Sequence, residues 1–198
     1  MRLVWPSCEH LPSYVAALQR GWSPDNMRAE AGREELERIT ADADAFLARL
    51  VDREAKDGAV TLPDGSSVPR LPGYHRWMWD GEFCGGINLR WQPGTEALPS
   101  HCLGHIGYAV VPWKQRRGYA TQALREILKD AAAEGLRYVE ITTDPDNVPS
   151  RRVIERNGGI LFEEFVAPAS LGGTRKLRYR VQIAALPPEG GSHMMKSK

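Results

Sequence analysis

The most constraining feature of this sequence is a change of hydrophobic period between residues 103 and 135. Residues 103–111 form a short apolar run that ends at Pro112, which is typical of a buried strand. From Gly118 to Gly135 a helix is predicted, because apolar residues recur at three- and four-residue steps: Ala120, Ala123, Leu124, Ile127, Leu128 and Ala131. A strand that leads through a short loop into a long helix predicts a sheet covered by helices.

The other segments predict the remaining elements of a mixed sheet. Helices are expected at 11–20 and at about 27–53, with the breaker residues 21–25 between them. Two β-prone runs, 74–79 and 83–91, flank Asp80-Gly81 and predict a β-hairpin. Residues 58–72 are expected to form an exposed loop, in which Pro63-Asp64-Gly65 permits a small hairpin. Further strands are predicted at 2–5, 138–142, 160–165 and 175–183, and a short helix at 149–156.

Composition and charge narrow the class of protein. A hydrophobic fraction of 42% supports a real core, and a net charge of +1 argues against a broad nucleic-acid-binding surface. No run approaches the roughly 18–20 apolar residues of a membrane span, and the first residues lack the apolar core of a signal peptide. The three cysteines have no framework spacing, so we expect free thiols and a cytoplasmic protein.

The loop between the predicted strand and helix carries the most chemistry. The start of a helix leaves backbone N–H groups unpaired and carries positive partial charge, so it favours anions. Gly118 lets a phosphate approach the backbone closely, and Lys114, Arg116 and Arg117 add positive charge. Neither the Rossmann nor the Walker glycine pattern is present. The loop therefore predicts a phosphate site, with a basic helix cap on a solvated surface as the alternative.

Two motifs in this region resemble those of the GNAT superfamily of N-acetyltransferases. Residues 115–120 (Gln-Arg-Arg-Gly-Tyr-Ala) are similar to its pyrophosphate signature, and residues 106–112 to the strand before it. Residues 146–158 resemble the second cofactor motif, in which Asn-x-x-Ser is followed by a helix and Asn-Gly. The order and spacing of the two motifs make the likeness specific, and it extends over about residues 70–182.

The resemblance implies a fold and a domain organisation. The fold would be an α/β (α+β) one of GNAT type, a mixed, mostly antiparallel twisted sheet flanked by helices, with splayed central strands. We expect one acetyltransferase domain over residues 1–183, comprising a variable helical part at 1–57 and a cofactor-binding sheet core at 70–183. Residues 190–198 are expected to be a cloning remnant.

The resemblance also implies the ligand and the residues that hold it. Acetyl-CoA would be the co-substrate, and an amine would attack its thioester directly in a ternary complex. Asn147 would bind the pantetheine amides; the alternative is an Asx turn after Asp144-Pro145. The remaining cofactor contacts would come from the splayed strand, the loop and the next helix: Val110, Val111, Gln115, Arg116, Arg117, Gly118, Tyr119, Ala120, Thr121 and Ser150.

Three residues are candidates for the chemistry. Relatives often place a tyrosine where this chain has Ile154, and the variant motif is similar to the ribosomal-protein N-terminal acetyltransferase branch, a resemblance that implies a serine as the group acting on the thiolate. Ser150 is therefore the candidate thiolate partner, or else a helix N-terminal residue. His105 stands where many relatives have a glutamate and is the candidate base, or else a core histidine. Glu82 is the fallback base, or else a solvated turn carboxylate.

Two other groups are interpreted structurally. His101, Cys102 and His105 lack a second ligand pair of usual spacing, so no metal site is predicted. The aromatic residues of the hairpin could line an acceptor pocket, but packing between sheet and helices is the more usual role of such a set: Tyr74, Trp77, Trp79 and Trp91.

The predicted function is an acetyl-CoA-dependent N-acetyltransferase. A catalytically silent CoA-binding regulatory module and a nucleotide- or phosphate-binding protein are the rival hypotheses. The acceptor is expected to be a small-molecule amine or a peptide N-terminus. The sequence does not choose between the two, because the segments around the acceptor carry no signature residues. No nucleic-acid or membrane partner is expected, and a homodimer is compatible with the sequence.

Overall fold

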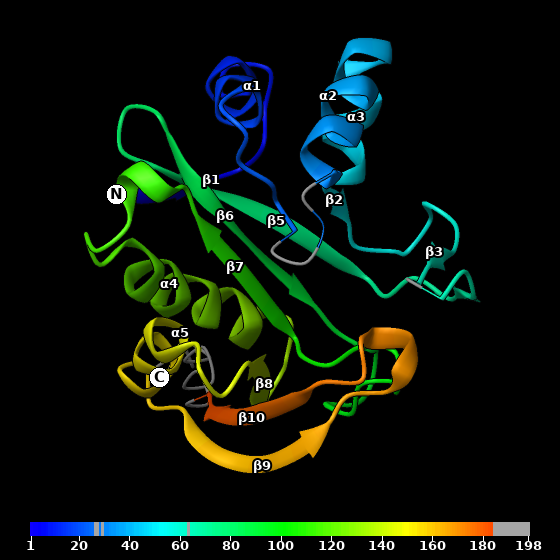
Figure 1. Cartoon of the computed structure of the whole chain (residues 1–198), viewed down its shortest axis with the longest axis vertical. Coiled ribbons are helices and arrows are strands. Elements are labelled where there is room, and N and C mark those ends of the chain that lie inside the picture. The colour runs from blue at the N-terminus through cyan, green and yellow to red at the C-terminus, as the bar shows by residue number, and fades with distance from the viewer. Residues whose placement is uncertain (26–27, 29, 63, 184–198) are drawn as a thin grey trace, which may run out of the picture.

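The computed structural model describes residues 1–25, 28, 30–62 and 64–183 (Figure 1). The predicted cloning remnant, the first residue of the predicted helix at 27–53 and Pro63 of the predicted turn lie outside the described residues. The elements in chain order are β1 Arg2–Val4, α1 Leu11–Gln19, α2 Ala31–Ala41, α3 Ala43–Arg49, β2 Val51–Asp52, β3 Val60–Thr61, β4 Ser67–Val68, β5 Gly73–Trp79, β6 Phe83–Arg90, β7 Ile106–Val110, the 3₁₀ turn η1 Pro112–Lys114, α4 Tyr119–Ala133, β8 Tyr138–Thr143, α5 Val148–Glu155, β9 Ile160–Val166, the 3₁₀ turn η2 Ala169–Leu171 and β10 Arg175–Gln182.

The strands form two main antiparallel sheets. The first has the order β1-β5-β6-β7, with β2 paired to β5, and the second has the order β8-β10-β9. The predicted hairpin is confirmed, with Gly73 opposite Arg90 and His75 opposite Asn88 across β5 and β6. The small hairpin in the loop is confirmed as well, because Val60 pairs with Val68. The mixed, mostly antiparallel α/β fold predicted from the sequence is therefore confirmed.

Helices cover both faces of the first sheet (Figure 1). On one face Met78, Ile87 and Leu89 pack with apolar residues of α4, β8 and β10. On the other face Trp77 and Phe83 pack with α1 and α3. Trp77 and Met78 enter different cores because successive strand residues point to opposite faces. Each buried side chain of this size stabilises the fold by roughly 1.5–3 kcal/mol, so both helical layers are held firmly to the sheet.

The prediction of a single helix at 27–53 is wrong, because the structure has two shorter helices there and the second ends before residue 53. The segment is divided at Asp42, whose backbone is extended (φ −161°) and whose carboxylate accepts a hydrogen bond from Ala45 N at 2.9 Å. An aspartate is a strong N-cap, so it starts α3 instead of continuing α2. The helix ends at Arg49, because Val51 and Asp52 pair with β5 as β2.

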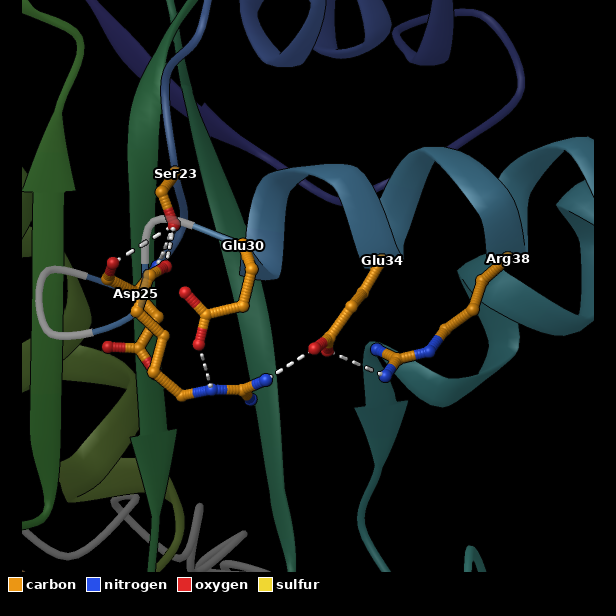
Figure 2. A network of polar contacts seen from close by, with 6 residues as sticks. Ser23, Asp25, Glu30, Glu34 and Arg38 are labelled. Atoms are coloured by element: carbon orange, nitrogen blue, oxygen red, sulfur yellow. Dashed lines mark hydrogen bonds and ion pairs between the residues drawn. The ribbon is translucent and has the colours of Figure 1, made fainter. Parts of the chain in front are cut away.

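A polar network fixes the entry into α2 (Figure 2). Ser23 Oγ donates to the carbonyl oxygens of Asp25 at 2.9 Å and Arg28 at 2.6 Å. The Arg28 guanidinium pairs with Glu30 and Glu34, and Glu34 also pairs with Arg38 at 3.3 Å. These surface pairs are each worth about 0–1 kcal/mol, so their main effect is to tie the segment before α2 to the helix.

The two sheets separate between β7 and β8. No strand ladder joins these strands within the described residues. The connection is made just before β7, where His105 N donates to Glu140 O at 2.8 Å and Thr142 Oγ1 donates to Leu103 O at 2.5 Å. The predicted strand at 103–111 is therefore too long at its start, because Leu103 and His105 bond to β8 and the ladder with β6 covers Ile106–Val110.

No helix among the residues placed in the structure is long and apolar enough to cross a membrane. The thiols of Cys8, Cys84 and Cys102 are free, as the cysteine spacing predicted.

Candidate active site

The loop before α4 has the backbone geometry of an anion site. Arg116 (φ 61°) and Gly118 (φ 77°) are both left-handed, and no atom lies within 4 Å of where a Cβ on Gly118 would stand. The first intrahelical hydrogen bond runs from Gln122 N to Gly118 O at 3.0 Å, so the N–H groups of the first turn have no carbonyl partner in the helix. A left-handed non-glycine residue costs roughly 1–2 kcal/mol, which is typical of a functional loop.

Lys114 does not extend into this loop. Its side chain is 10% exposed, and its ammonium lies 3.1 Å from Asp80 Oδ2 and 2.6 Å from Glu82 Oε1. Tyr119 Oη donates to Asp80 Oδ2 at 2.6 Å. Burial works against the Asp80 carboxylate, but hydrogen bonds from Tyr119, Cys84 and Lys114 hold its pKa well below its usual range. The cluster ties the β5–β6 turn to α4, and it holds the candidate base Glu82 in an ion pair.

Arg116 and Arg117 are the cations that remain for phosphate. Both are exposed, and neither forms an ion pair with a carboxylate of the described residues. Gln115 is also exposed, and its Nε2 donates to Val110 O at 3.4 Å, which closes the loop back onto the end of β7. Val110 is half-buried and Val111 is fully buried. The predicted cofactor residues of the first motif therefore lie together at one end of β7.

The second motif forms the start of α5. Asn147 is the N-cap, and its Oδ1 accepts from Ser150 N at 3.1 Å. The Asn147 side chain thus has a structural role as a helix cap, where the sequence offered an Asx turn as the alternative to cofactor binding, and its Nδ2 has no hydrogen bond to any described residue. Asn157, at the other end of α5, donates from Nδ2 to Thr121 O at 3.2 Å in the first turn of α4. The two motifs are therefore linked directly.

A tyrosine that the sequence did not single out joins Ser150. Tyr108, on β7, places its hydroxyl 2.9 Å from Ser150 Oγ, across the gap between the two sheets. Burial raises the pKa of Tyr108 to about 12, so the phenol stays protonated near neutral pH. Ile154 is fully buried and packs against Gly159. The only local signal for Tyr108 was its place in Gly107-Tyr108, which strand alternation alone does not distinguish from a core position.

His105 is fully buried between β7 and β8. Its Nδ1 accepts from Glu140 N at 2.9 Å, and its Nε2 has no hydrogen-bond partner among the described residues. Because Nδ1 accepts, the neutral ring carries its proton on Nε2 and has no second lone pair for a substrate proton. Burial lowers the pKa of His105, although Glu140 acts in the opposite direction. This geometry favours the core-histidine interpretation.

A second candidate region lies on the α3 side of the first sheet. A cavity of about 180 Å³ is lined by residues of α3, β2, the β3–β4 hairpin, β5, β6 and the loop before β7. His75, Asn88 and Gly107 lie abreast on β5, β6 and β7. Burial, with Arg90 and Arg70, lowers the pKa of His75 to about 4, so the imidazole is neutral at pH 7. No motif predicted this region, because its lining comes from segments far apart in the sequence.

The aromatic residues of the β5–β6 hairpin pack mainly against other rings. Trp77 stacks on Tyr14 with ring centroids 4.6 Å apart, and Trp91 packs edge-on to Tyr74. Of the predicted aromatic group only Tyr74 also lines the cavity. Within the described part of the chain, no three His, Cys, Asp or Glu side chains are grouped closely enough to hold a metal ion.

Among the described residues β7 pairs with β6 alone, and it leads into a helix start whose backbone geometry suits an anion. A model of the acetyltransferase (GNAT) domain matches residues 3–160. The chain therefore belongs to the GNAT acetyltransferase family and is an acetyltransferase. Comparison with curated protein sequences gives no match.

Solved structures share this fold at low sequence identity. Mycobacterium smegmatis RimJ, in complex with CoA-disulfide, aligns with a TM-score of 0.61 and 18% identity over 91% of this chain and 80% of that one. The microcin self-immunity acetyltransferase MccE, in complex with acetyl-CoA and AMP, gives 0.60 and 13% over 91% of both chains. RimL, a ribosomal α-N-protein acetyltransferase in complex with coenzyme A, gives 0.55 and 15% over 91% and 93%.

Proposed function

We propose that this protein transfers the acetyl group of acetyl-CoA to a primary amine by direct attack in a ternary complex. The observation that carries the proposal is the loop at Arg116 and Gly118, open in front of a helix start, at the end of a strand whose other side has no strand partner among the described residues. Such a site presents backbone N–H groups to a pyrophosphate and a free strand edge to pantetheine. RimJ, RimL and MccE each bind CoA or acetyl-CoA, which supports this choice of ligand.

Each cofactor contact has a physical role in this proposal. The N–H groups of residues 116–121 bind the pyrophosphate, and the side chains of Arg116 and Arg117 add charge. The backbone of Val110 and Val111 faces the pantetheine, with Gln115 holding the loop. The unengaged amide nitrogen of Asn147 donates to a pantetheine carbonyl while its oxygen keeps α5 capped.

The transfer step forms an N–C bond and breaks the C–S bond. The attacking amine loses one proton overall and the CoA thiolate gains one, so no further reactant is consumed. We infer that the hydroxyl pair of Ser150 and Tyr108 hydrogen-bonds the sulfur as negative charge develops there. A donor that stays protonated suits this task, since burial keeps the Tyr108 phenol neutral.

The amine proton is treated separately. His105 is buried with Nδ1 occupied, and one carboxylate oxygen of Glu82 is paired with the Lys114 ammonium, so we assign neither residue as the base. We propose that the acceptor reacts as the free amine, held in position by the pocket. The pH dependence of turnover then follows the acceptor's own ionisation, and it shifts when a less basic amine is used.

A screen of amines with acetyl-CoA, read by mass spectrometry, tests the proposed function. An N-acetylated product from at least one amine is expected. Binding of acetyl-CoA without transfer to any amine would support the silent CoA-binding module instead. A larger thermal stabilisation by ATP than by acetyl-CoA would support the nucleotide-binding hypothesis, since a ligand at 100 times its dissociation constant adds about 2.7 kcal/mol.

The remaining expectations stand as proposals with simple measurements. RimL acts on a protein N-terminus, which makes short peptides a natural part of the amine screen. One domain over residues 1–183 predicts a single cooperative unfolding transition. A homodimer predicts a doubled mass by light scattering. A cytoplasmic location is measured by fractionation.

A further inference from the structure

The cavity on the α3 side of the first sheet is small and strongly basic. Its volume of about 180 Å³ is below the roughly 300–1,000 Å³ of a drug-sized site, so it has room for one substituent of a ligand. Three guanidinium groups line it, from Arg49, Arg70 and Arg90, against the single carboxylate of Asp52. The excess of positive charge indicates that the substituent is an anion.

The pairing of these arginines identifies the one that is available. Arg49 Nε lies 3.1 Å from Asp57 Oδ2, and Arg70 Nε lies 3.9 Å from Asp52 Oδ2. Asp52 also accepts hydrogen bonds from the backbone N–H groups of residues 56 and 57. The Arg90 side chain has no carboxylate partner among the described residues, and its one hydrogen bond to them runs from Nη2 to Asn88 Oδ1 at 3.4 Å. Arg90 is therefore the unbalanced charge of the cavity.

Two buried nitrogen atoms add to this picture. Arg90 Nε and His101 Nε2 are shielded from solvent and have no hydrogen-bond partner in the described part of the chain. Both residues line the cavity. An unsatisfied buried polar group destabilises the fold, so a bound anion that accepted a hydrogen bond from Arg90 Nε would recover part of that cost.

Arg90 and Asn88, which line the cavity, also contact the strand that faces the proposed cofactor. Arg90 Nη2 and the Asn88 amide lie 3.4 Å from the position of a Cβ on Gly107, and Asn88 Oδ1 accepts from Gly107 N at 3.2 Å. The next residue, Tyr108, points to the opposite face of β7, where its hydroxyl meets Ser150. An anion held by Arg90 would therefore belong to a molecule whose next atoms lie beside β7.

We propose that this cavity is the acceptor pocket and that it selects amines which also carry a carboxylate or a phosphate, with Arg90 as the counter-ion. The inference rests on the proposed function, since it names the substrate class of the same reaction. Arg90 and His75 both line the cavity, and Arg90 Nε is shielded from solvent.

Matched acceptor pairs test this selection. Glutamate α-amide is compared with glutamine amide, Asp-Ala amide with Asn-Ala amide, and phosphoethanolamine with ethanolamine, each with acetyl-CoA, so that only one member of each pair carries an acidic group. We expect kcat/KM at least tenfold higher for the acidic member of one or more pairs, and the pairs distinguish a carboxylate from a phosphate. Equal or faster reaction of the neutral members in all three pairs would overturn the proposal.

Variants of Arg90 assign the selection to this cavity. Arg90→Gln should reduce the ratio of acidic to neutral acceptor by about tenfold, whereas Arg90→Lys should keep most of it. Arg33→Gln, at an exposed position of α2, makes the same charge change and should leave the ratio unaltered. An unchanged ratio in Arg90→Gln that still binds acetyl-CoA would rule out the pocket.

The two proposals fail in different ways. Acetyl-CoA binding is measured by calorimetry without any acceptor, and its absence would remove the proposed function itself. With CoA present, calorimetry of each acidic and neutral pair gives a readout that does not require turnover. Binding of acetyl-CoA together with no preference for any acidic amine would overturn only the acceptor inference.

Discussion

The two halves of this molecule obtain a binding site in different ways. Around β7, α4 and α5 the candidate site is made largely of backbone, with left-handed residues at Arg116 and Gly118 and a capped helix start at Asn147. Around β2, β5 and β6 it is made of side chains, with Arg90 and His75 facing a cavity. A site made of backbone needs particular residues at particular spacings in the sequence. A site made of side chains needs only that suitable residues come close together in the folded chain.

This difference explains why one half is readable from sequence. Only glycine adopts the Gly118 conformation without strain, so the requirement is written locally as a motif. The second half, which holds the proposed acceptor pocket, brings together α3, the β3–β4 hairpin, β6 and the loop before β7. A cation from any of these segments could pair with the anion of an acceptor. Single substitutions should therefore abolish cofactor binding in the first half and change acceptor preference by smaller steps in the second.

The largest effect is expected from Gly118→Glu. A side chain at φ 77° is strained, and the carboxylate adds negative charge where pyrophosphate must approach the backbone. Acetyl-CoA affinity should fall by more than about 10³-fold in calorimetry. Gly94→Glu is the matched control, because Gly94 has φ 78° and equally open surroundings. Retained affinity in a folded Gly118→Glu variant would remove the phosphate-loop assignment.

The hydroxyl pair should give the next largest effect. Tyr108→Phe and Ser150→Ala are each expected to lower kcat by roughly 10²-fold, because each removes one donor that supports the departing thiolate. The double variant should lose little more than either single variant, since the two hydroxyls act as one unit. Affinity for acetyl-CoA serves as the control and should change little. Full additivity of the two losses would show that the hydroxyls act independently.

Acid stability tests the charge environment of the acceptor half. The pKa of His75 is lowered from 6.5 to about 4, so the unfolded chain binds a proton more readily than the folded one does. The stability linked to His75 is therefore present above pH 6.5 and is lost as the pH falls towards 4. Chemical denaturation at pH 7 and pH 5 should show His75→Gln losing about 2 kcal/mol less than the parent. Equal losses would mean that His75 is exposed to solvent and not buried beside Arg90.

His105 separates a catalytic role from a structural one. If its ring only joins β7 to β8, His105→Ala should lower stability, because Glu140 N–H loses its acceptor, and should change turnover by less than about tenfold. His105→Asn, which can still accept that hydrogen bond, should restore part of the stability. A fall in turnover of roughly 10²–10⁴-fold, together with loss of the parent's pH limb on the same acceptor, would instead identify His105 as the base.

The smallest effect concerns the 3′-phosphate of the cofactor. Arg116 and Arg117 are exposed and without ion pairs among the described residues, and such contacts are worth roughly 0–1 kcal/mol each. Dephospho-CoA should therefore bind within about tenfold of CoA in a competition assay. A difference of more than about a hundredfold would show an ordered basic site in the backbone half.

The elements that the sequence predicted well are those with a strong local period. The β5–β6 hairpin, α4 and the last strands follow from alternation, helical stripes and turn residues. The break at Asp42 was missed because apolar residues continue through it, and only the cap geometry shows the helix ending there. The early turn of residues 103–105 towards β8 was missed because a long-range pairing with Glu140 outweighs the local strand pattern.

The candidate site divides in the same way. The motifs predict that the residues from Gln115 to Thr121 and Asn147 bind one cofactor, and the structure links the two motifs through Asn157 and Thr121. Tyr108 and His75 were missed because their partners, Ser150 and Asn88, lie 42 and 13 positions away. Arg90 was missed because the cavity that it lines is formed by segments far apart in the sequence. A single sequence carries no record of which side chains meet across a sheet.

The most direct test of the central claim is a titration of acetyl-CoA followed by a turnover assay on the same preparation. Calorimetry should give one site per chain, abolished by Gly118→Glu and kept by Gly94→Glu. Mass spectrometry of the amine panel should then show one N-acetylated product formed for each acetyl-CoA consumed. One-site binding with no acetylated amine, or consumption of acetyl-CoA that persists in Gly118→Glu, would contradict the account.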